Sequence, residues 1–267
     1  MGNDLRNLAL LLRYDGTNYH GWQSQKNGTT VQEAVSLAIL RLTGEKPLPE
    51  LHGVGRTDAG VHALNYVANF HTSSGIPADR FPYALRPYLP GDIAVMAASD
   101  VAPDFHARYS CLEKTYCYKL YAGRIPDPFL KNRAYFTPFY PDLGRMKEAA
   151  AFLPGTRDFR AFRASNYTAK GSVRTVTRLD VEEIEPGHFT VTVSADGFLY
   201  NMVRIIAGTL FYAGIGKLEP LDVKRILENG NRPDAGITLP PHGLYLLSAR
   251  YPAGSFSGGD EAFDPKV

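Results

Sequence analysis

Cysteine and tryptophan are scarce in this chain of 267 residues, which has two cysteines and one tryptophan. Cys111 and Cys117 cannot build a disulfide framework, and their spacing is not that of a metal site. The chain also lacks a nucleotide-binding P-loop, an H-E-x-x-H zinc motif and a G-x-S-x-G nucleophile elbow. Its seven histidines have no ligand-like spacing. We therefore predict chemistry that uses neither a metal nor a cofactor.

Long apolar runs and a targeting segment are missing as well. Residues 1–6 have neither the apolar core nor the cleavage site of a secretory signal, and no apolar run could span a bilayer. A cytoplasmic protein is therefore expected. The net charge is only +2, so any surface for nucleic acid must be a local patch. A hydrophobic content of 44% can fill one large domain or two packed halves.

The hydrophobic pattern of the first hundred residues predicts strand, helix, strand, strand, helix and strand. Its best-defined helix begins at the capping box Thr30-Val31-Gln32-Glu33 and ends at Gly44. A similar order recurs later, with a helix over 199–214. Two such βαββαβ halves predict an α+β fold, with ferredoxin-like or RRM-like halves, a mixed but mainly antiparallel sheet and a cleft between the halves. The expected ranges are 1–104 for the first half, 105–252 for the second half and 253–267 for a flexible tail.

The stretch Gly55-Arg56-Thr57-Asp58-Ala59-Gly60 places one carboxylate in a glycine-rich bend. Glycines allow the backbone to turn sharply and another molecule to come close. Asp before a small residue and glycine is also ordinary turn chemistry. The stretch is therefore either a plain turn or a turn that presents Asp58 to a ligand.

Two residues of the second half are candidate partners of Asp58. Arg204 lies off the apolar stripe of its predicted helix, on the same side as Gly208, and is either solvated or paired with a carboxylate. Arg56 and Arg204 beside Asp58 would keep the carboxylate ionised, which suits a nucleophile or a general base. Strand alternation places Tyr116 and Tyr118 on one face, either as core residues or as a platform for a base.

A basic segment is the third candidate feature. Its cations are Arg157, Arg160, Arg163, Lys170, Arg174 and Arg178, and its aromatic residues are Phe159, Phe162 and Tyr167. This mixture is typical of a loop and strand that follow a phosphate backbone, although a solvated surface explains it equally well. The single tryptophan, Trp22, is interpreted as a packing residue.

Several motifs together resemble the tRNA pseudouridine synthase A family over nearly the whole chain. The stretch from Gly55 to Ala63 is similar to the active-site motif of that family. The other motifs, in chain order, are Tyr14-Asp15-Gly16, Gly21-Trp22-Gln23, Phe105-His106-Ala107-Arg108, Lys114-Thr115-Tyr116-Cys117-Tyr118, Asp158-Phe159-Arg160-Ala161-Phe162, the run from Gly197 to Arg204, and Gly243-Leu244-Tyr245-Leu246.

The resemblance implies the pseudouridine synthase fold and a homodimer that isomerises uridine in the anticodon stem-loop of tRNA, at positions 38, 39 and 40. Asp58 would be the nucleophile, and Arg204 would hold it by a salt bridge. Tyr116 would stack on the flipped base and take part in proton transfer. Arg56 and Leu244 would bind the substrate, the first at the phosphate backbone and the second in the apolar wall of the pocket.

Two other functions compete with this interpretation. A noncatalytic RNA-binding module with tandem ferredoxin-like halves would leave Asp58 without a special role. A carboxylate-based glycoside hydrolase would need two facing carboxylates, and the central motif offers only one.

Overall fold

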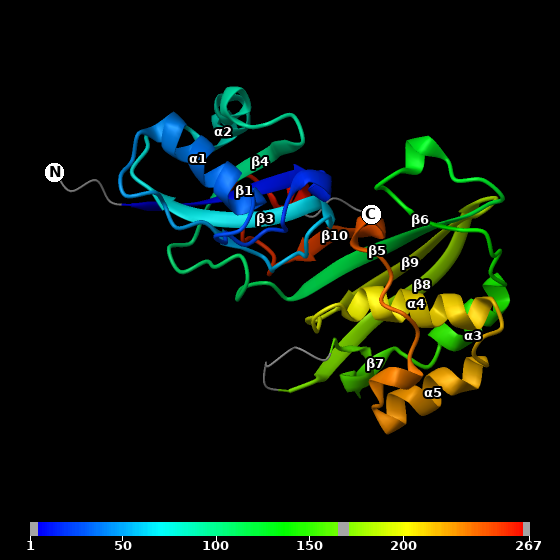
Figure 1. Ribbon diagram of the computed structural model, residues 1–267. Helices are drawn as coiled ribbons and strands as arrows, with labels where there is room; N and C mark the ends of the chain where they lie inside the picture. Colours follow the sequence, from blue (N-terminus) through cyan, green and yellow to red (C-terminus); the bar gives the residue numbers. More distant parts are fainter. Residues whose placement is uncertain (1–4, 165–170, 264–267) are drawn as a thin grey trace. The chain divides into compact units, whose positions relative to one another are not determined.

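The computed structural model describes residues 5–164 and 171–263, which divide into two compact units (Figure 1). Unit 1 consists of the segments up to Leu112 and from Leu246 onward, and unit 2 runs from Glu113 to Tyr245. The helices and strands of unit 1 are β1 (Arg6–Tyr14), α1 (Val31–Thr43), β2 (His52–Gly53), β3 (His62–Thr72), α2 (Phe81–Leu85) and β4 (Ile93–Val101). Strand β10 (Leu244–Arg250) crosses the boundary, with most of its residues in unit 1.

The sheet of unit 1 has β1 at its centre. β1 pairs antiparallel with β3 and β4, so that Leu10 lies opposite Ala68 on one side and Ala98 on the other. On its other side β3 lies next to β10 and also pairs with the short β2, so the order β4-β1-β3-β2 expected of a ferredoxin-like half is present. α1 and α2 lie over one face of this sheet (Figure 1). The run from Leu8 to Leu12 is almost fully buried because helices and loops cover both faces of β1.

Local sequence signals fix the ends of α1 as expected. Thr30 Oγ1 accepts the backbone N–H of Glu33, and Gly44 closes the helix in the left-handed conformation. The second helix predicted for the first hundred residues is short, because α2 is a single turn flanked by 3-10 turns. Pro82 and Pro87 fall within this stretch, and proline cannot donate the hydrogen bonds that a longer helix would need.

Unit 2 is built around a set of mainly antiparallel strands. Its elements are β5 (Glu113–Ala122), β6 (Tyr135–Thr137), α3 (Leu143–Ala150), β7 (Gly155–Asp158), β8 (Val173–Glu185), β9 (His188–Ala195), α4 (Met202–Gly214) and α5 (Pro220–Asn229). β9 pairs with both β5 and β8, and β7 pairs with β8. β6 is the parallel exception, beside β5. The strands of both units therefore pair mainly antiparallel, and the α+β prediction is confirmed. β6 and β7 were not predicted, because three or four residues are too few to show a period.

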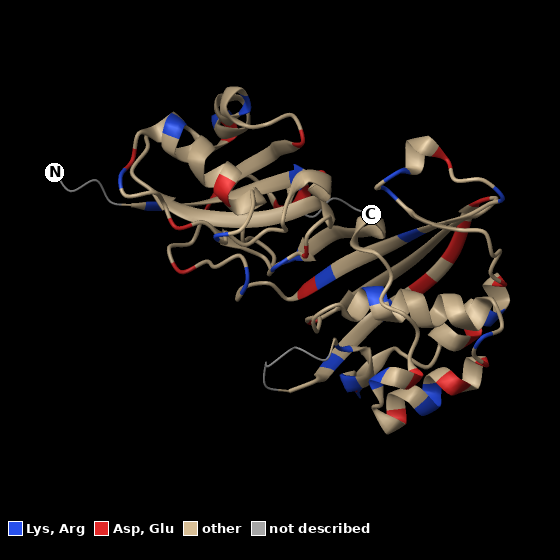
Figure 2. Ribbon diagram, viewed as in Figure 1, with Lys and Arg blue, Asp and Glu red and all other residues tan. Residues whose placement is uncertain are grey.

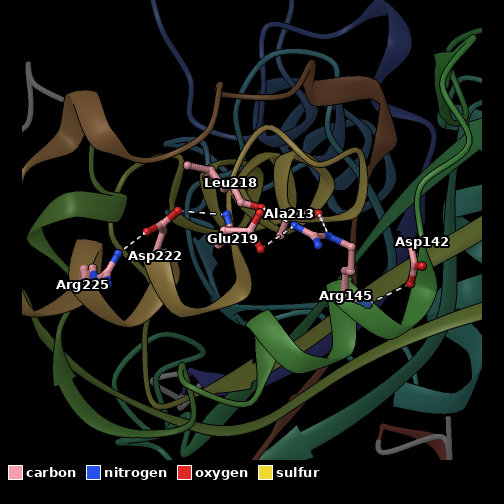
Figure 3. Close-up of polar contacts among 7 residues, drawn as sticks. All are labelled: Asp142, Arg145, Ala213, Leu218, Glu219, Asp222 and Arg225. Atoms are coloured by element: carbon pink, nitrogen blue, oxygen red, sulfur yellow. Dashed lines mark hydrogen bonds and ion pairs between the residues drawn. The ribbon is translucent and has the colours of Figure 1, made fainter.

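One arginine links the three helices of unit 2 (Figure 3). Arg145 on α3 donates from Nε to the Ala213 carbonyl near the end of α4, at 3.0 Å. Its Nη2 reaches both the Leu218 carbonyl and the Glu219 carboxylate, each at 3.1 Å. Glu219 is the N-cap of α5, and its N–H donates to the Asp222 side chain. This network holds the end of α4, the start of α5 and the side of α3 in one arrangement.

The units divide the chain differently from the predicted halves, at residues 112 and 245 instead of 104 and 252. Residues 105–112 belong to unit 1 because buried side chains of its sheet hold them. Asn7 Nδ2 donates to the Phe105 carbonyl at 2.8 Å, and Asn69 Oδ1 accepts the N–H of Ala107 at 2.8 Å. Composition alone could not show these two contacts.

Residues 253–263 also differ from the predicted flexible tail. Phe256 and Phe263 are 5% and 2% exposed, and their rings stack with centroids 4.0 Å apart. The backbone N–H of Ser257 donates to the Asp100 carbonyl at the end of β4. A glycine- and serine-rich composition suggested flexibility, but two aromatic anchors are enough to dock the segment on unit 1.

Candidate active site

The loop that carries Asp58 lies between β2 and β3 of unit 1 and forms a tight turn. The N–H of Val61 donates to the Asp58 carbonyl at 3.2 Å, and Gly60 has a φ of 80°. The predicted bend is therefore confirmed. Asp58 is half-buried, whereas Arg56 in the same loop is exposed. The turn thus sets the backbone on both sides of the carboxylate.

Three aromatic side chains support this loop from within unit 1. Trp22 is 2% exposed and stacks on Tyr66, with ring centroids 4.1 Å apart. The Tyr66 hydroxyl donates to the Gly55 carbonyl, and the Tyr14 hydroxyl shares a hydrogen bond of 2.9 Å with Thr57 Oγ1. The packing interpretation of Trp22 is confirmed. Tyr66 and Tyr14 hold the loop at Gly55 and Thr57, ahead of Asp58, a role that the sequence did not indicate.

Gly21 explains why the motif Gly21-Trp22-Gln23 lies beside the Asp58 loop. The N–H of Trp22 donates to the Thr57 carbonyl at 3.2 Å, which draws the two segments together. A Cβ on Gly21 would lie only 2.3 Å from that carbonyl oxygen, and its φ of +84° also favours glycine. The peptide that precedes Asp58 is therefore clamped by a backbone contact that only glycine permits.

Tyr116 lies on β5 in unit 2, opposite Val193 of β9. Its ring meets Phe198 edge-on, with centroids 5.1 Å apart and an interplanar angle of 82°. Aromatic rings favour this edge-to-face arrangement, which orients both partners. The ring of Tyr116 is thus positioned by the loop that follows β9.

Arg204 is not a freely solvated arginine. It lies in the first turn of α4 and is half-buried. Its Nε donates to the Leu239 carbonyl and its Nη1 to Asn201 Oδ1, each at 2.7 Å. Asn201 itself has the left-handed conformation, with a φ of 61°, and forms the N-cap of α4. These contacts hold the guanidinium group in one orientation.

Gly208, on the same side of α4 as Arg204, has a close neighbour. A Cβ on Gly208 would lie 2.0 Å from the Ile237 carbonyl oxygen. The segment before Leu239 can therefore run directly against the helix. This close approach brings the Leu239 carbonyl within reach of Arg204.

Tyr118 packs against the segment that carries Leu244 and feels the charge of Arg204. It is fully buried, and its hydroxyl donates to the Pro240 carbonyl at 2.7 Å. Burial raises the pKa of Tyr118 far above its usual range, although the charge of Arg204 opposes the shift, so the hydroxyl stays a proton donor. Its ring packs against Gly243, next to Leu244, which is 7% exposed. The sequence placed Tyr118 on the face of Tyr116 but gave no sign of this linking role.

The basic segment of unit 2 is partly neutralised (Figure 2). Arg157 and Arg174 lie directly opposite each other on β7 and β8, whereas Arg160 pairs with Asp158 at 3.1 Å. Arg178 likewise pairs with Asp180. Like charges on facing strands repel each other, so Arg157 and Arg174 form the part of the segment best suited to a phosphate.

The aromatic residues of this segment do not serve as a surface for bases. Phe159 and Phe162 are fully buried and meet edge-on in the core of unit 2. Tyr167 and Lys170 lie outside the described residues. In the described part of the segment, therefore, only the arginines are available to contact RNA, because the two phenylalanines are buried.

The candidate residues thus fall into two groups. Asp58 and Arg56 share a loop in unit 1, whereas Tyr116, Arg204 and Leu244 belong to unit 2. Within the described ranges, no three His, Cys, Asp or Glu side chains are grouped to hold a metal ion. No helix in the same ranges is both long and apolar enough to cross a membrane.

Comparison with known proteins identifies the family. A family model described as tRNA pseudouridine synthase matches residues 11–110 and 149–252. The chain belongs to the tRNA pseudouridine synthase family. The matched ranges contain the Asp58 loop and the α4 helix, while Tyr116 lies between them. The predicted family, enzyme class and pseudouridine synthase fold are therefore confirmed, and the chain is an isomerase.

Individual relatives in this family are similar over almost their whole length. The chain is 49% identical over 247 residues to the tRNA pseudouridine synthase A of Acetivibrio thermocellus, covering 92% of this chain and 100% of the relative. It is 47% identical to the enzyme of the same name from a Thermoanaerobacter species, with the same coverage of both chains. It is 45% identical to tRNA pseudouridine synthase A 2 of Clostridium perfringens, again over 92% and 100%.

Proposed function

We propose that this enzyme converts uridine to pseudouridine in the anticodon stem-loop of tRNA, at positions 38, 39 and 40, with Asp58 as the nucleophile. The observation that carries the proposal is the Asp58 loop, whose flanking peptides are fixed by Tyr14, Trp22 and Tyr66. A carboxylate presented on a rigid turn can attack without first being ordered. A noncatalytic RNA-binding module would not need this support.

Unit 2 would supply the partners of the nucleophile. Arg204, whose guanidinium is already oriented by Leu239 and Asn201, would pair with Asp58 and keep it ionised. Tyr116 would stack on the extruded base and take part in proton transfer. Stacking on an aromatic ring contributes about 1–3 kcal/mol per base, which offsets the few kcal/mol that base extrusion costs.

The reaction needs no external electron donor or acceptor. Attack by Asp58 allows the bond between the ribose and the uracil nitrogen to break. The uracil turns and is rejoined to the sugar through carbon, and the bond to Asp58 breaks, which frees the carboxylate. The proton lost from that carbon is balanced by one gained at the released nitrogen. Substrate and product therefore contain the same atoms.

The remaining contacts would bind the RNA. Arg56, exposed in the loop of the nucleophile, would contact backbone phosphate near the extruded nucleotide. Leu244 would form part of the apolar wall of the pocket. We propose a cytoplasmic homodimer, in which two protomers contribute to one basic groove despite the net charge of +2 per chain.

Replacement of the nucleophile tests the proposal. Asp58→Asn is expected to abolish pseudouridine formation in a uridine-containing tRNA transcript, with tRNA affinity changed less than about threefold, because the amide keeps the size of the side chain but cannot attack. Pseudouridine is mapped along the transcript, and affinity is measured by equilibrium binding.

Asp104→Asn is the matched control, since Asp104 is an exposed carboxylate elsewhere in unit 1. It should form pseudouridine at the wild-type rate. Full activity of the Asp58→Asn enzyme would exclude the nucleophile assignment. Modification only outside the anticodon arm would exclude the proposed position.

A further inference from the structure

Four side chains of unit 1 that the proposed mechanism does not use form a continuous stack. The rings of His52 and His106 have centroids 4.5 Å apart and are tilted by 31°, and those of His106 and Tyr109 have centroids 4.4 Å apart and are tilted by 42°. The guanidinium carbon of Arg108 lies over the Tyr109 ring, 5.6 Å from its centroid. Tyr109 is 76% exposed, so the stack ends at the surface.

The loop that carries this stack is held more firmly than an exposed loop requires. Two asparagines of the sheet, Asn7 and Asn69, are 2% and 1% exposed and direct their amides at it. Asn69 Oδ1 accepts the Ala107 N–H while its Nδ2 donates to the Phe105 carbonyl at 3.2 Å, and the Tyr251 hydroxyl donates to the Ala107 carbonyl at 2.6 Å. Buried polar groups held in this way give the loop one conformation.

Asn69 also connects the stack to the Asp58 loop. Asn69 on β3 is the register partner of His52 on β2, the first ring of the stack. β2 leads directly into the turn at 55–60. A single paired strand therefore fixes the stack and the proposed nucleophile relative to the same sheet.

The charges around the stack suit an RNA nucleotide. Burial, followed by the repulsion from His52, lowers the pKa of His106, and its Nδ1 accepts the Arg108 N–H at 3.1 Å, so the middle ring is neutral. Arg108 is exposed and supplies a positive charge at the outer end. The nearby carboxylate, Glu50, is 3.7 Å from His52 Nδ1, at the opposite end of the stack. An exposed tyrosine ring in contact with an exposed arginine is an arrangement that binds unpaired bases.

We propose that Tyr109, with Arg108 beside it, stacks on one unpaired nucleobase of the tRNA substrate, and that the two histidines support its ring. Arg108 contributes a second flat face and attracts the adjacent phosphate. The inference rests on the proposed function, because it takes tRNA as the substrate. It adds a binding site in unit 1 that is separate from the stacking assigned to Tyr116.

The test uses an RNA anticodon stem-loop with 2-aminopurine placed in turn at each unpaired position. The fluorescence of this base falls when it stacks on an aromatic ring. At one position the wild-type enzyme should quench the signal, and Tyr109→Ala should remove the quenching and raise the Kd about tenfold. Tyr109→Trp should keep both. Arg108→Ala should weaken binding and reduce the slope of log Kd against log salt by about one.

Tyr83→Ala is the matched control, because Tyr83 is 74% exposed on α2 of the same unit and should affect neither readout. An unchanged Kd and unchanged quenching in Tyr109→Ala would overturn the inference, provided that wild-type enzyme still forms pseudouridine in a full transcript. Failure of the wild-type enzyme to form pseudouridine would instead contradict the proposed function. The two failures are therefore distinguishable.

Discussion

Thr57 helps to position Asp58, although no chemical step is assigned to Thr57 itself. It directly precedes Asp58 and is 8% exposed. Its hydroxyl meets that of Tyr14 at 2.9 Å, and its carbonyl accepts the Trp22 N–H at 3.2 Å. The position of the Asp58 carboxylate is therefore set one residue upstream, by a side chain that points into the core.

Removing this hydroxyl should impair catalysis more than stability. Thr57→Val keeps the shape but loses the hydrogen bond to Tyr14, which costs about 1 kcal/mol of the free energy of unfolding. A small displacement of a nucleophile strongly slows the chemical step. We therefore expect kcat for pseudouridine formation to fall roughly tenfold with KM nearly constant. Single-turnover assays measure the change.

Thr57→Ser provides the control, since it retains the hydroxyl and should retain most of the activity. A wild-type kcat in Thr57→Val would show that the Tyr14 contact does not position Asp58.

At the scale of elements, α1 ends on polar contacts to the end of a strand. Glu45 follows Gly44 at the end of α1 and reaches the end of β3. Its carboxylate accepts the hydroxyls of Thr72 and Ser73, at 2.7 and 2.6 Å, and the Ser73 N–H. Burial raises the pKa of Glu45, but the hydrogen bonds from Ser73 and Thr72 together outweigh it, so the pKa is lowered overall. The carboxylate thus attaches α1 to the sheet in its ionised form.

Glu45→Gln should destabilise unit 1 in a pH-dependent way. The folded pKa lies below the unfolded value of about 4.3, so this contribution is complete above that value and is lost as the pH falls through the folded pKa. We expect Glu45→Gln to lower the free energy of unfolding by about 1–2 kcal/mol at pH 7 and by less at pH 3. Urea unfolding followed by fluorescence reports on unit 1, because Trp22 is the only tryptophan.

The exposed Glu261→Gln is a control for charge removal and should leave the unfolding midpoint unchanged. A deficit for Glu45→Gln that is equal at both pH values would contradict the assigned ionised state.

At the scale of the whole molecule, unit 1 is assembled from both ends of the chain. The segment after Pro252 lies beyond the residues that the family model matches, yet it contributes two buried phenylalanines. Phe256 meets Phe105 and Tyr251 with ring centroids 5.8 and 5.6 Å away. Tyr251 in turn holds the Ala107 carbonyl, so the C-terminal segment supports the loop of the proposed stacking site.

Phe263→Ala tests this contribution. Loss of a fully buried phenylalanine costs about 3–5 kcal/mol, and the stacked Phe256 would lose its partner. We expect a clear fall in the urea midpoint of unit 1, measured by Trp22 fluorescence. Phe129→Ala, at a phenylalanine that is 87% exposed, should leave that midpoint unchanged. Equal midpoints for the two variants would mean that the segment does not stabilise unit 1.

The sequence by itself determined most of the elements and the family of this protein. Capping at Thr30 and Gly44, strand alternation around Tyr116 and the glycine-flanked Asp58 are local signals, since each depends on neighbours within a few residues. Residue type and order were also enough to show the family. The pairing of Asp58 with Arg204 stays a prediction.

Only the tertiary structure decided which distant groups hold these elements in place. The contacts of Tyr118 with Pro240 and of Asn69 with Ala107 join residues far apart in the chain, and no local pattern encodes them. The same is true of the C-terminal segment, whose composition suggested flexibility until Phe256 and Phe263 were found packed together. Long-range packing is decided by the sum of many weak contacts, which a pattern of residues along the chain does not record.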